Sequence, residues 1–267
     1  MKRTQPNRLD QGGRIARSQP VRFSFDGKTY YGYRGDTLAS ALLANGVKLV
    51  GRSFKYHRPR GIYSAGPEEP NALMQLRSGA QTEPNTRATV IELFDGLEAT
   101  SQNRWPSLRF DWRAINQKFS ALLPAGFYYK TFMWPKKFWM FYEHQIRRAA
   151  GLGKAPLHKD PDHYAYEYAH REVLIVGGGP AGLSAALAAA RSGKRIVLAD
   201  ERSELGGSAL WENKLIDDMR ASEWVDQTIA TLRSYPNVRV LPRSTVSGIY
   251  DHGLVTIAER VTDHLPQ

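Results

Sequence analysis

A run of glycines between residues 177 and 182 has the spacing of a loop that holds phosphate groups. The run reads Gly177-Gly178-Gly179-Pro180-Ala181-Gly182 and matches G-x-G-x-x-G. In such a loop the first glycine permits a tight turn, the second lets the backbone approach a pyrophosphate, and the third lets a helix pack on a strand. The N-terminus of that helix adds amides and the positive end of its dipole. The spacing therefore predicts a pyrophosphate-binding loop.

The segments around this loop have the pattern of a strand–helix–strand unit. Residues 173–176 are a continuous apolar run, typical of a buried parallel strand. An alanine-rich helix is predicted over 183–192, ending at Gly193, and a second strand over 195–199. Because these elements follow in order, a dinucleotide-binding fold is favoured over a glycine-rich turn that binds nothing.

Acidic residues follow the second predicted strand. Asp200 stands 23 residues after Gly177 and is followed by Glu201. A carboxylate at this point accepts hydrogen bonds from ribose hydroxyls. Its charge favours NAD or FAD over NADP, whose extra phosphate it repels, and the neighbouring Arg202 partly offsets this preference.

A Leu-Gly-Gly run at 205–207 resembles the flavin disulfide reductase group, in which the glycine backbone passes close to the cofactor. Residues 238–241 look like a further strand, and 244–246 look like its exit loop, which meets the adenine in those folds. The predicted cofactor contacts are Gly177, Gly179, Pro180, Ala181, Gly182, Asp200, Glu201, Arg202, Gly207, Ser208 and Val246.

No catalytic acid–base pair and no metal site are predicted. The seven histidines lack metal-ligand spacing, and the chain has no cysteine, which excludes disulfides, cysteine-ligated clusters and cysteine nucleophiles within it. We expect the histidines to lie at the surface or to serve packing. His57 stands in a basic loop that either is a solvated or structural loop or meets a flavin phosphate across an interface; its cations are Arg52, Lys55, Arg58 and Arg60.

The N-terminal half predicts a small α+β domain. Residues 1–19 are polar and predict an arm or extended tail, and residues 20–98 form the domain itself. Within it, alternating residues on both sides of Asp26-Gly27 predict a hairpin, and a helix is predicted from Asp36 or Thr37 to Asn45-Gly46. A loop rich in glycine and proline spans 51–70, and a further strand is predicted over 89–93.

An aromatic-rich connector is predicted over 99–170, before the dinucleotide-binding domain at 171–267. Prolines at 106, 124, 135, 156 and 161 break any long helix there. We expect its aromatic side chains to pack against neighbouring domains, with a substrate-facing or flavin-facing role as the alternative. An exposed apolar stripe would instead mark a subunit interface. Its aromatic residues are Trp105, Trp112, Phe127, Tyr128, Tyr129, Phe132, Trp134, Phe138, Trp139, Phe141 and Tyr142.

The charge and the hydropathy limit the class of protein. A net charge of +11 accompanies no nucleic-acid-binding motif, which favours an acidic partner subunit or an anionic ligand over nucleic acid. No apolar run approaches the ~20 residues of a membrane span, and no apolar segment of a secretory signal follows the basic N-terminus. Together with the lack of cysteine, this predicts a cytoplasmic protein without a membrane span.

Several long runs together resemble the alpha subunit of heterotetrameric sarcosine oxidase. The runs lie at residues 35–46, 51–61, 66–72, 84–88, 101–106 and 124–132, in addition to the glycine loop. The fold class that follows is α+β and α/β: a ferredoxin-like domain without a cluster, then a partial doubly wound, Rossmann-like dinucleotide-binding domain. The loop at 51–70, where cluster-bearing relatives have cysteines, has none.

The resemblance also implies a function. In that family the alpha subunit binds NAD at the glycine loop without redox turnover, and a beta subunit carries FAD and covalent FMN, with FMN at the interface between the two. Sarcosine is oxidised on the beta subunit, electrons pass to oxygen, and tetrahydrofolate takes up the one-carbon unit. The partners are then the flavin-bearing beta subunit and smaller subunits.

The family's alpha subunit is several-fold longer, so the chain is interpreted as its N-terminal portion, inactive by itself. Two alternatives stay open. One is an amine or opine dehydrogenase whose alpha subunit binds FAD at the same loop. The other is a non-catalytic dinucleotide-binding or assembly module that stabilises a partner.

Overall fold

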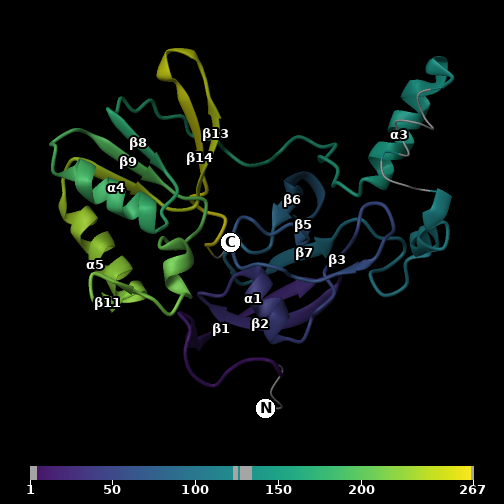
Figure 1. Ribbon diagram of the computed structural model, residues 1–267, viewed down its shortest axis with the longest axis horizontal. Helices are drawn as coiled ribbons and strands as arrows, with labels where there is room; N and C mark the ends of the chain where they lie inside the picture. The colour runs from purple at the N-terminus through teal and green to yellow at the C-terminus, as the bar shows by residue number, and fades with distance from the viewer. Residues whose placement is uncertain (1–4, 123–125, 127–133, 266–267) are drawn as a thin grey trace. The chain divides into compact units, whose positions relative to one another are not determined.

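The chain folds into two compact units, Met1–Asp162 and His163–Gln267 (Figure 1). The computed structural model describes residues 5–122, 126 and 134–265. Within these residues, no helix combines the length and the apolar character needed to cross a membrane.

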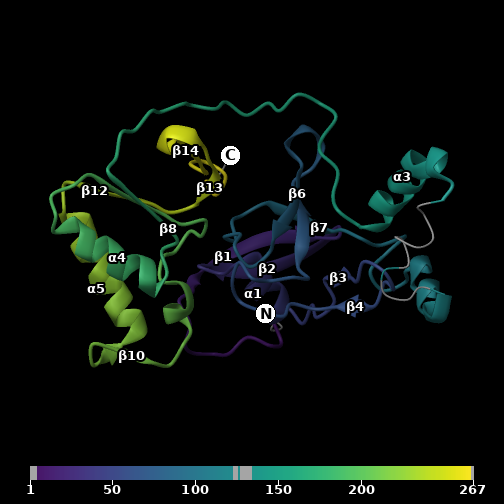
Figure 2. The ribbon, with the colours of Figure 1, turned by 45° about the horizontal axis from the view of Figure 1, so that its top comes forward.

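A five-stranded sheet of order β2-β1-β7-β5-β6 forms the centre of the first unit (Figure 2). Strand β1 pairs antiparallel with β2 across the Asp26-Gly27 turn, where both residues have positive φ, so the predicted hairpin is confirmed. Strand β1 starts inside the segment predicted as an arm, and it pairs in parallel with β7. The strands are β1 (Ala16–Phe25), β2 (Lys28–Arg34), β5 (Leu73–Leu76), β6 (Glu83–Arg87) and β7 (Leu97–Ser101).

Helix α1 (Leu38–Ala44) packs on this sheet through a fully buried face. Thr37 and Ser40 form a capping box at its N-terminus, and Asn45 ends it, as predicted. The core joins Leu38 and Leu42 of the helix to Phe23, Met74 and Leu97 of the strands. The N-terminal half is thus the predicted ferredoxin-like α+β domain.

The strand predicted over residues 89–93 is wrong. The segment is a turn with a single bridge from Glu92 to Thr37, although Thr89, Ile91 and Leu93 are buried in alternation as in a strand. Its backbone partners lie at the start of α1 instead of in the sheet. The Leu38 amide donates to the Ile91 carbonyl, and the Leu93 amide donates to the backbone carbonyl of Asp36. An alternating pattern reports burial, and it does not identify the hydrogen-bonding partner.

Within the described residues of the connector the helices are short, and the longest has 11 residues. They are η2 (Trp112–Gln117), η3 (Ser120–Leu122), η4 (Lys136–Phe138) and α3 (Trp139–Ala149). The side chains of Trp105, Trp112 and Trp134 are 57%, 58% and 80% exposed, and their packing against neighbouring domains stays a prediction. The predicted aromatic residues Phe127, Tyr128, Tyr129 and Phe132 lie outside the described residues.

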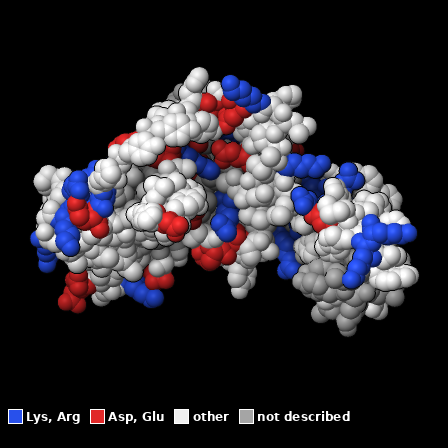
Figure 3. Space-filling model, turned by 90° about the horizontal axis from the view of Figure 1, so that it is seen from above, with Lys and Arg blue, Asp and Glu red and all other residues white. Residues whose placement is uncertain are grey.

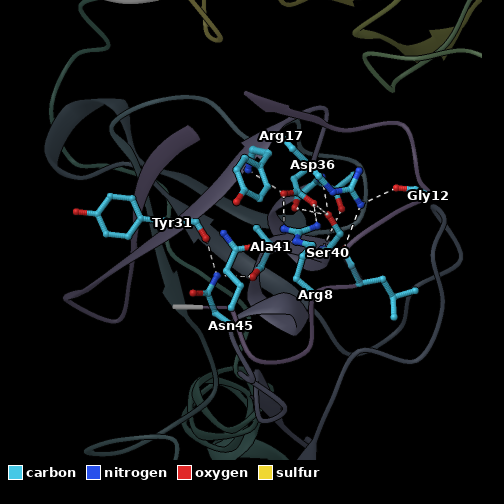
Figure 4. A network of polar contacts seen from close by, with 12 residues as sticks. Arg8, Gly12, Arg17, Tyr31, Asp36, Ser40, Ala41 and Asn45 are labelled. Atoms are coloured by element: carbon cyan, nitrogen blue, oxygen red, sulfur yellow. Dashed lines mark hydrogen bonds and ion pairs between the residues drawn. The ribbon is translucent and has the colours of Figure 1, made fainter. Parts of the chain in front are cut away.

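Residues 5–9, within the segment predicted as an arm or extended tail, contact the folded part of the first unit. Arg8 makes a two-pronged ion pair with the buried Asp36, with N–O distances of 2.9 and 2.6 Å (Figure 4). Its guanidinium also lies over the Tyr33 ring. The Asn7 amide donates to the carbonyl of Ala44, at the end of α1. A buried carboxylate needs a charged or hydrogen-bonded partner, and here the N-terminal segment supplies it.

The second unit contains a three-stranded parallel sheet of order β12-β9-β8. Its helices α4 and α5 pack against each other and on this sheet, with Leu183, Ile196, Leu198, Val225 and Leu232 in the core. This is the first βαβαβ half of a doubly wound fold, as predicted. The bounds are β8 (Val173–Val176), α4 (Pro180–Ala190), β9 (Ile196–Ala199), α5 (Ala221–Ser234) and β12 (Val238–Leu241).

Two local expectations in this unit are wrong. Strand β8 is not buried on all sides: it is an edge strand, and Val176 is 59% exposed, whereas the central strand β9 is buried throughout. Residues 244–246 are not a loop but the start of β13 (Ser244–Ile249), which pairs with β14 (Val255–Glu259) in a separate antiparallel ribbon.

The remaining elements are short. They are β3 (Gly51–Arg52), β4 (Pro59–Arg60), η1 (Gly79–Gln81), η5 (Gly207–Leu210), β10 (Leu215–Ile216), β11 (Met219–Arg220) and η6 (Asp251–Gly253).

Candidate dinucleotide-binding site

The glycine loop joins the end of β8 to the start of α4 by a turn that requires Gly177. Its φ of +98° lies in the region that favours glycine. The Gly177 amide donates to the Ala199 carbonyl at 2.8 Å, and the Gly178 amide donates to Oδ2 of Asp200 at 2.5 Å. The loop is therefore held against the carboxyl end of β9, where the sequence places the acidic residue.

Gly182 is required by close packing between the helix and the strand. A Cβ atom there would lie 1.8 Å from the carbonyl oxygen of Gly177. Gly178 is restricted as well, since its Cβ would lie 2.7 Å from the Leu205 side chain. The G-x-G-x-x-G pattern identifies Gly182 and not Gly178, because Gly178 occupies a variable position of the motif.

Gly179, in contrast, faces open space. A Cβ atom there would meet no other atom within 4 Å. Helix α4 begins directly after it with Pro180 at the first position, and the amides of Ala181 and Gly182 in its first turn have no intrahelical acceptor. The backbone thus offers donors, the positive end of a helix dipole and room for close approach, which together suit a pyrophosphate.

Asp200 follows β9 and accepts two backbone hydrogen bonds. Its Oδ2 takes the Gly178 amide, and its Oδ1 takes the Arg202 amide at 2.8 Å. Each carboxylate oxygen has a second lone pair, so both can still accept from ribose hydroxyls. Glu201 is partly exposed beside it, and the Arg202 guanidinium lies over the Trp211 ring at 5.0 Å from its centre.

The second glycine run contacts the first. The Gly206 amide donates to the Gly178 carbonyl at 2.7 Å, and a Cβ on Gly207 would lie 3.0 Å from the Cα of Gly179. Both glycines of this run have positive φ. The carbonyl of Ser208, in η5, accepts the Trp211 amide. The structure therefore brings together two segments that the sequence predicts separately.

Val246 lies in a strand and not in the loop predicted to meet the adenine. It is half-buried within β13, opposite Ile257 of β14. The start of that strand does reach the acidic residue, because the Ser244 amide donates to the carbonyl of Asp200 at 2.7 Å. The predicted cofactor contacts leave out Leu205, although it belongs to the Leu-Gly-Gly run, and sequence reasoning missed Trp211; both contact predicted residues from outside the glycine motif.

Two polar side chains of the loop at 51–70 have partners within the first unit. His57 is 1% exposed, and its Nδ1 lies 2.7 Å from Oδ2 of the equally buried Asp111. Arg52 donates to the carbonyls of His57 and Leu108. The histidine is thus a packing residue, one of the two roles expected for it, and it does not face a ligand.

Glu69 organises the other end of this loop. Its carboxylate accepts the amides of Tyr63 and Ser64 on one oxygen and those of Asn71 and Ala72 on the other. Burial alone raises the pKa of Glu69, but these four amides outweigh it and hold the pKa below its ordinary value.

Two family models match the chain. A 2Fe-2S iron-sulfur cluster binding domain matches residues 18–104, and an FAD dependent oxidoreductase matches residues 172–263. A [2Fe–2S] cluster does not fit this chain, because it contains no cysteine to ligate the iron. Across the described residues, no group of three or more histidines and carboxylates gathers to hold a metal ion. The dinucleotide geometry fits the second family.

Two similar proteins are alpha subunits of one kind of enzyme. The chain is 55% identical to sarcosine oxidase subunit alpha of Rhizobium meliloti (strain 1021), covering 97% of this chain and 26% of that protein. It is 35% identical to the subunit of the same name from Corynebacterium sp. (strain U-96), covering 98% and 23%. The chain thus spans about a quarter of the length of these relatives.

A solved structure supports the fold. L-proline dehydrogenase from P. horikoshii superposes with a TM-score of 0.53 at 20% identity, over 94% of this chain and 38% of the other. By sequence, this chain is therefore related over nearly its whole length to the alpha subunit of sarcosine oxidase, with a ferredoxin-like domain that lacks cluster ligands and a dinucleotide fold of the oxidoreductase type.

Proposed function

We propose that the glycine loop binds the ADP half of NAD, in an alpha-type subunit of a sarcosine-oxidising complex. The observation that carries this is the open face of Gly179 directly before the first turn of α4. Gly178 and Gly182 are restricted by protein atoms, whereas Gly179 borders space that a pyrophosphate would occupy.

Several of the predicted residues then have a role in holding the cofactor. The amides of Ala181 and Gly182 donate to the phosphates, and Asp200 accepts from the adenosine ribose. Glu201 and Arg202 border the ribose, while Gly207 and Ser208 line the second glycine run. When bound, NAD supplies a nicotinamide able to carry a hydride, and its role here is structural.

The complex as a whole would oxidise sarcosine to glycine, with electrons passing to oxygen to give hydrogen peroxide and the one-carbon unit passing to tetrahydrofolate. The similarity to sarcosine oxidase alpha subunits supports this. FAD and FMN would lie on, or be shared with, the beta subunit. This chain would supply no catalytic residue and would be inactive by itself.

FAD at the same loop is the second candidate, in a subunit of an amine or opine dehydrogenase. The match of residues 172–263 to an FAD dependent oxidoreductase favours it. FAD and NAD share the ADP half, so the amides and Asp200 serve either one. A module that binds a dinucleotide only to stabilise an assembly is the third candidate.

Cofactor release and titration test these candidates. The purified chain is denatured, the released nucleotides are separated by chromatography, and NAD, FAD and ADP-ribose are titrated calorimetrically. We expect NAD to bind, and Gly179→Ala to weaken it at least tenfold with unchanged thermal stability, because the added methyl enters open space. Ala185→Leu, on the exposed face of α4, is the matched control. FAD release supports the second candidate, and no binding of any dinucleotide contradicts all three.

A further inference from the structure

We propose that residues 105–122 and 134–148, termed the aromatic lobe, form a docking surface for an acidic, partly apolar surface of another subunit. This inference rests on the proposed function in one respect, that the chain is one subunit of several. It concerns a different region from the glycine loop.

The excess positive charge of the chain is concentrated around this lobe. Residues 104–154 contain ten lysines and arginines and two carboxylates, so they carry a net +8 of the chain's +11. Both carboxylates already have partners, since Asp111 pairs with the buried His57 and Glu143 pairs with Arg147. A surface with this balance attracts a partner of negative charge.

Large apolar side chains lie between these cations. Six of them are each 53–62% exposed, from the segment before η2 to the middle of α3. Exposed apolar groups gathered on one region mark an interaction site, and aromatic residues with arginine are the types enriched at protein interfaces. Lys and Arg side chains lie over the same lobe, at the right of Figure 3. The six are Trp105, Phe110, Trp112, Ile115, Met140 and Phe141.

The distribution of side chains around α3 favours a protein partner over a lipid surface. At 100° per residue, Met140 and Phe141 fall on the same face as Arg147 and Arg148, and all four are exposed. Tyr142, which packs beside Phe138, and Ile146 point the other way and are half-buried. A helix that lies in a membrane separates its apolar face from its charged face. The mixed face of α3 fits a protein surface in which carboxylates alternate with apolar groups.

The test uses the whole chain with the remaining subunits of the sarcosine oxidase of Rhizobium meliloti (strain 1021). Association is measured by light scattering and by titration at low and high salt. We expect binding that weakens with salt, and at least a tenfold loss of affinity in the double variant Phe141→Glu with Arg148→Glu. Ala185→Glu with Arg191→Glu, at exposed residues of α4 and its C-cap, makes the same change in net charge elsewhere and should bind normally.

Four results would overturn the proposal. They are no association of the unaltered chain, equal association of both double variants, a lobe-dependent dimer of the chain alone, and lobe-dependent pelleting with phosphatidylserine vesicles. The last two would assign the lobe to a second copy or to a lipid surface. Thermal unfolding and NAD titration of each variant separate these results from a failure of the glycine-loop proposal, because neither double variant touches that loop.

Discussion

Two loops of this chain belong to folds that hold cofactors, and they differ in whether their polar groups have hydrogen-bond partners within the chain. In the loop at 51–70, His57, Arg52 and Glu69 are satisfied by Asp111 and by backbone groups of the chain itself. In the glycine loop, the first-turn amides of α4 point away from any helical acceptor, and the Cα of Gly179 borders open space.

The difference separates a structural loop from a ligand loop. A buried polar group costs free energy unless it has a partner, so a loop without a cofactor is stable where the chain itself supplies those partners. A loop that keeps its ligand leaves donors and space for it. On this criterion the named polar groups of the first loop serve the structure, and the glycine loop keeps the donors and the space that the proposed dinucleotide site requires. Variants in both loops can break or sharpen that contrast.

Gly182→Val should have the largest effect. Its Cβ would lie 1.8 Å from the Gly177 carbonyl, so the helix must move away from the strand and the loop must change shape. We expect the second unit to lose more than about 4 kcal/mol of stability and the chain to lose NAD binding. Urea unfolding and calorimetric titration measure both, with Ala185→Leu as control. Unchanged stability and affinity would contradict the packing argument.

Asp111→Ala should destabilise the first unit by roughly 3–5 kcal/mol without affecting NAD affinity. The change leaves the buried His57 without its partner and also removes the acceptor for the Arg113 amide at the start of η2. His57→Asn is the companion variant, since asparagine tolerates the positive φ of this position. If the losses in free energy of unfolding of the two single variants simply add in the double variant, His57 and Asp111 do not interact, which would contradict the role of this pair in the loop.

Glu69→Gln should cost less, about 2–3 kcal/mol, because the amide keeps one acceptor oxygen for two of the four backbone donors. The exposed neighbour substitution Glu68→Gln is the matched control and should cost little. Thermal unfolding measures the difference.

The stabilities of Glu69→Gln and Glu68→Gln should also differ in their dependence on pH. The folded-state pKa of Glu69 lies below its ordinary value, so its stabilisation is present above the unfolded carboxyl pKa of about 4.3 and is lost as the pH falls through the folded value. We expect Glu69→Gln to flatten the loss of stability below about pH 4.3, and Glu68→Gln to leave it unchanged. Parallel curves for all three proteins would contradict the role of these amides.

The sequence predicts those parts of the fold whose signals are local. The Asp26-Gly27 hairpin, helix α1 with its cap at Thr37, and the βαβ unit around Gly177 each follow from adjacent residues. Prediction fails where the partner is distant: residues 89–93 alternate like a strand but bond to the start of α1, and Val176 is apolar but lies on an edge strand.

The candidate site shows the same limit. The motif identifies Gly177, Gly179 and Gly182 because their roles lie within one loop. It cannot identify Leu205, which restricts Gly178 from 27 residues further along the chain. Nor does composition show that His57 is buried against Asp111, since a basic loop and a closed loop have the same residues.

Asp200→Asn should have the smallest effect and the most specific one. The carboxylate accepts the Gly178 and Arg202 amides, so it shapes the loop besides facing the ribose. Asparagine keeps one acceptor and removes the charge that repels a 2′-phosphate. We expect about a tenfold weaker affinity for NAD, about 1.4 kcal/mol, and a smaller preference over NADP. Glu223→Gln, an exposed carboxylate in the first turn of α5, is the control and should leave that preference unchanged. The ratio of the two dissociation constants is the decisive measurement, because a purely structural role for Asp200 would lower stability and both affinities together while leaving the ratio as it was.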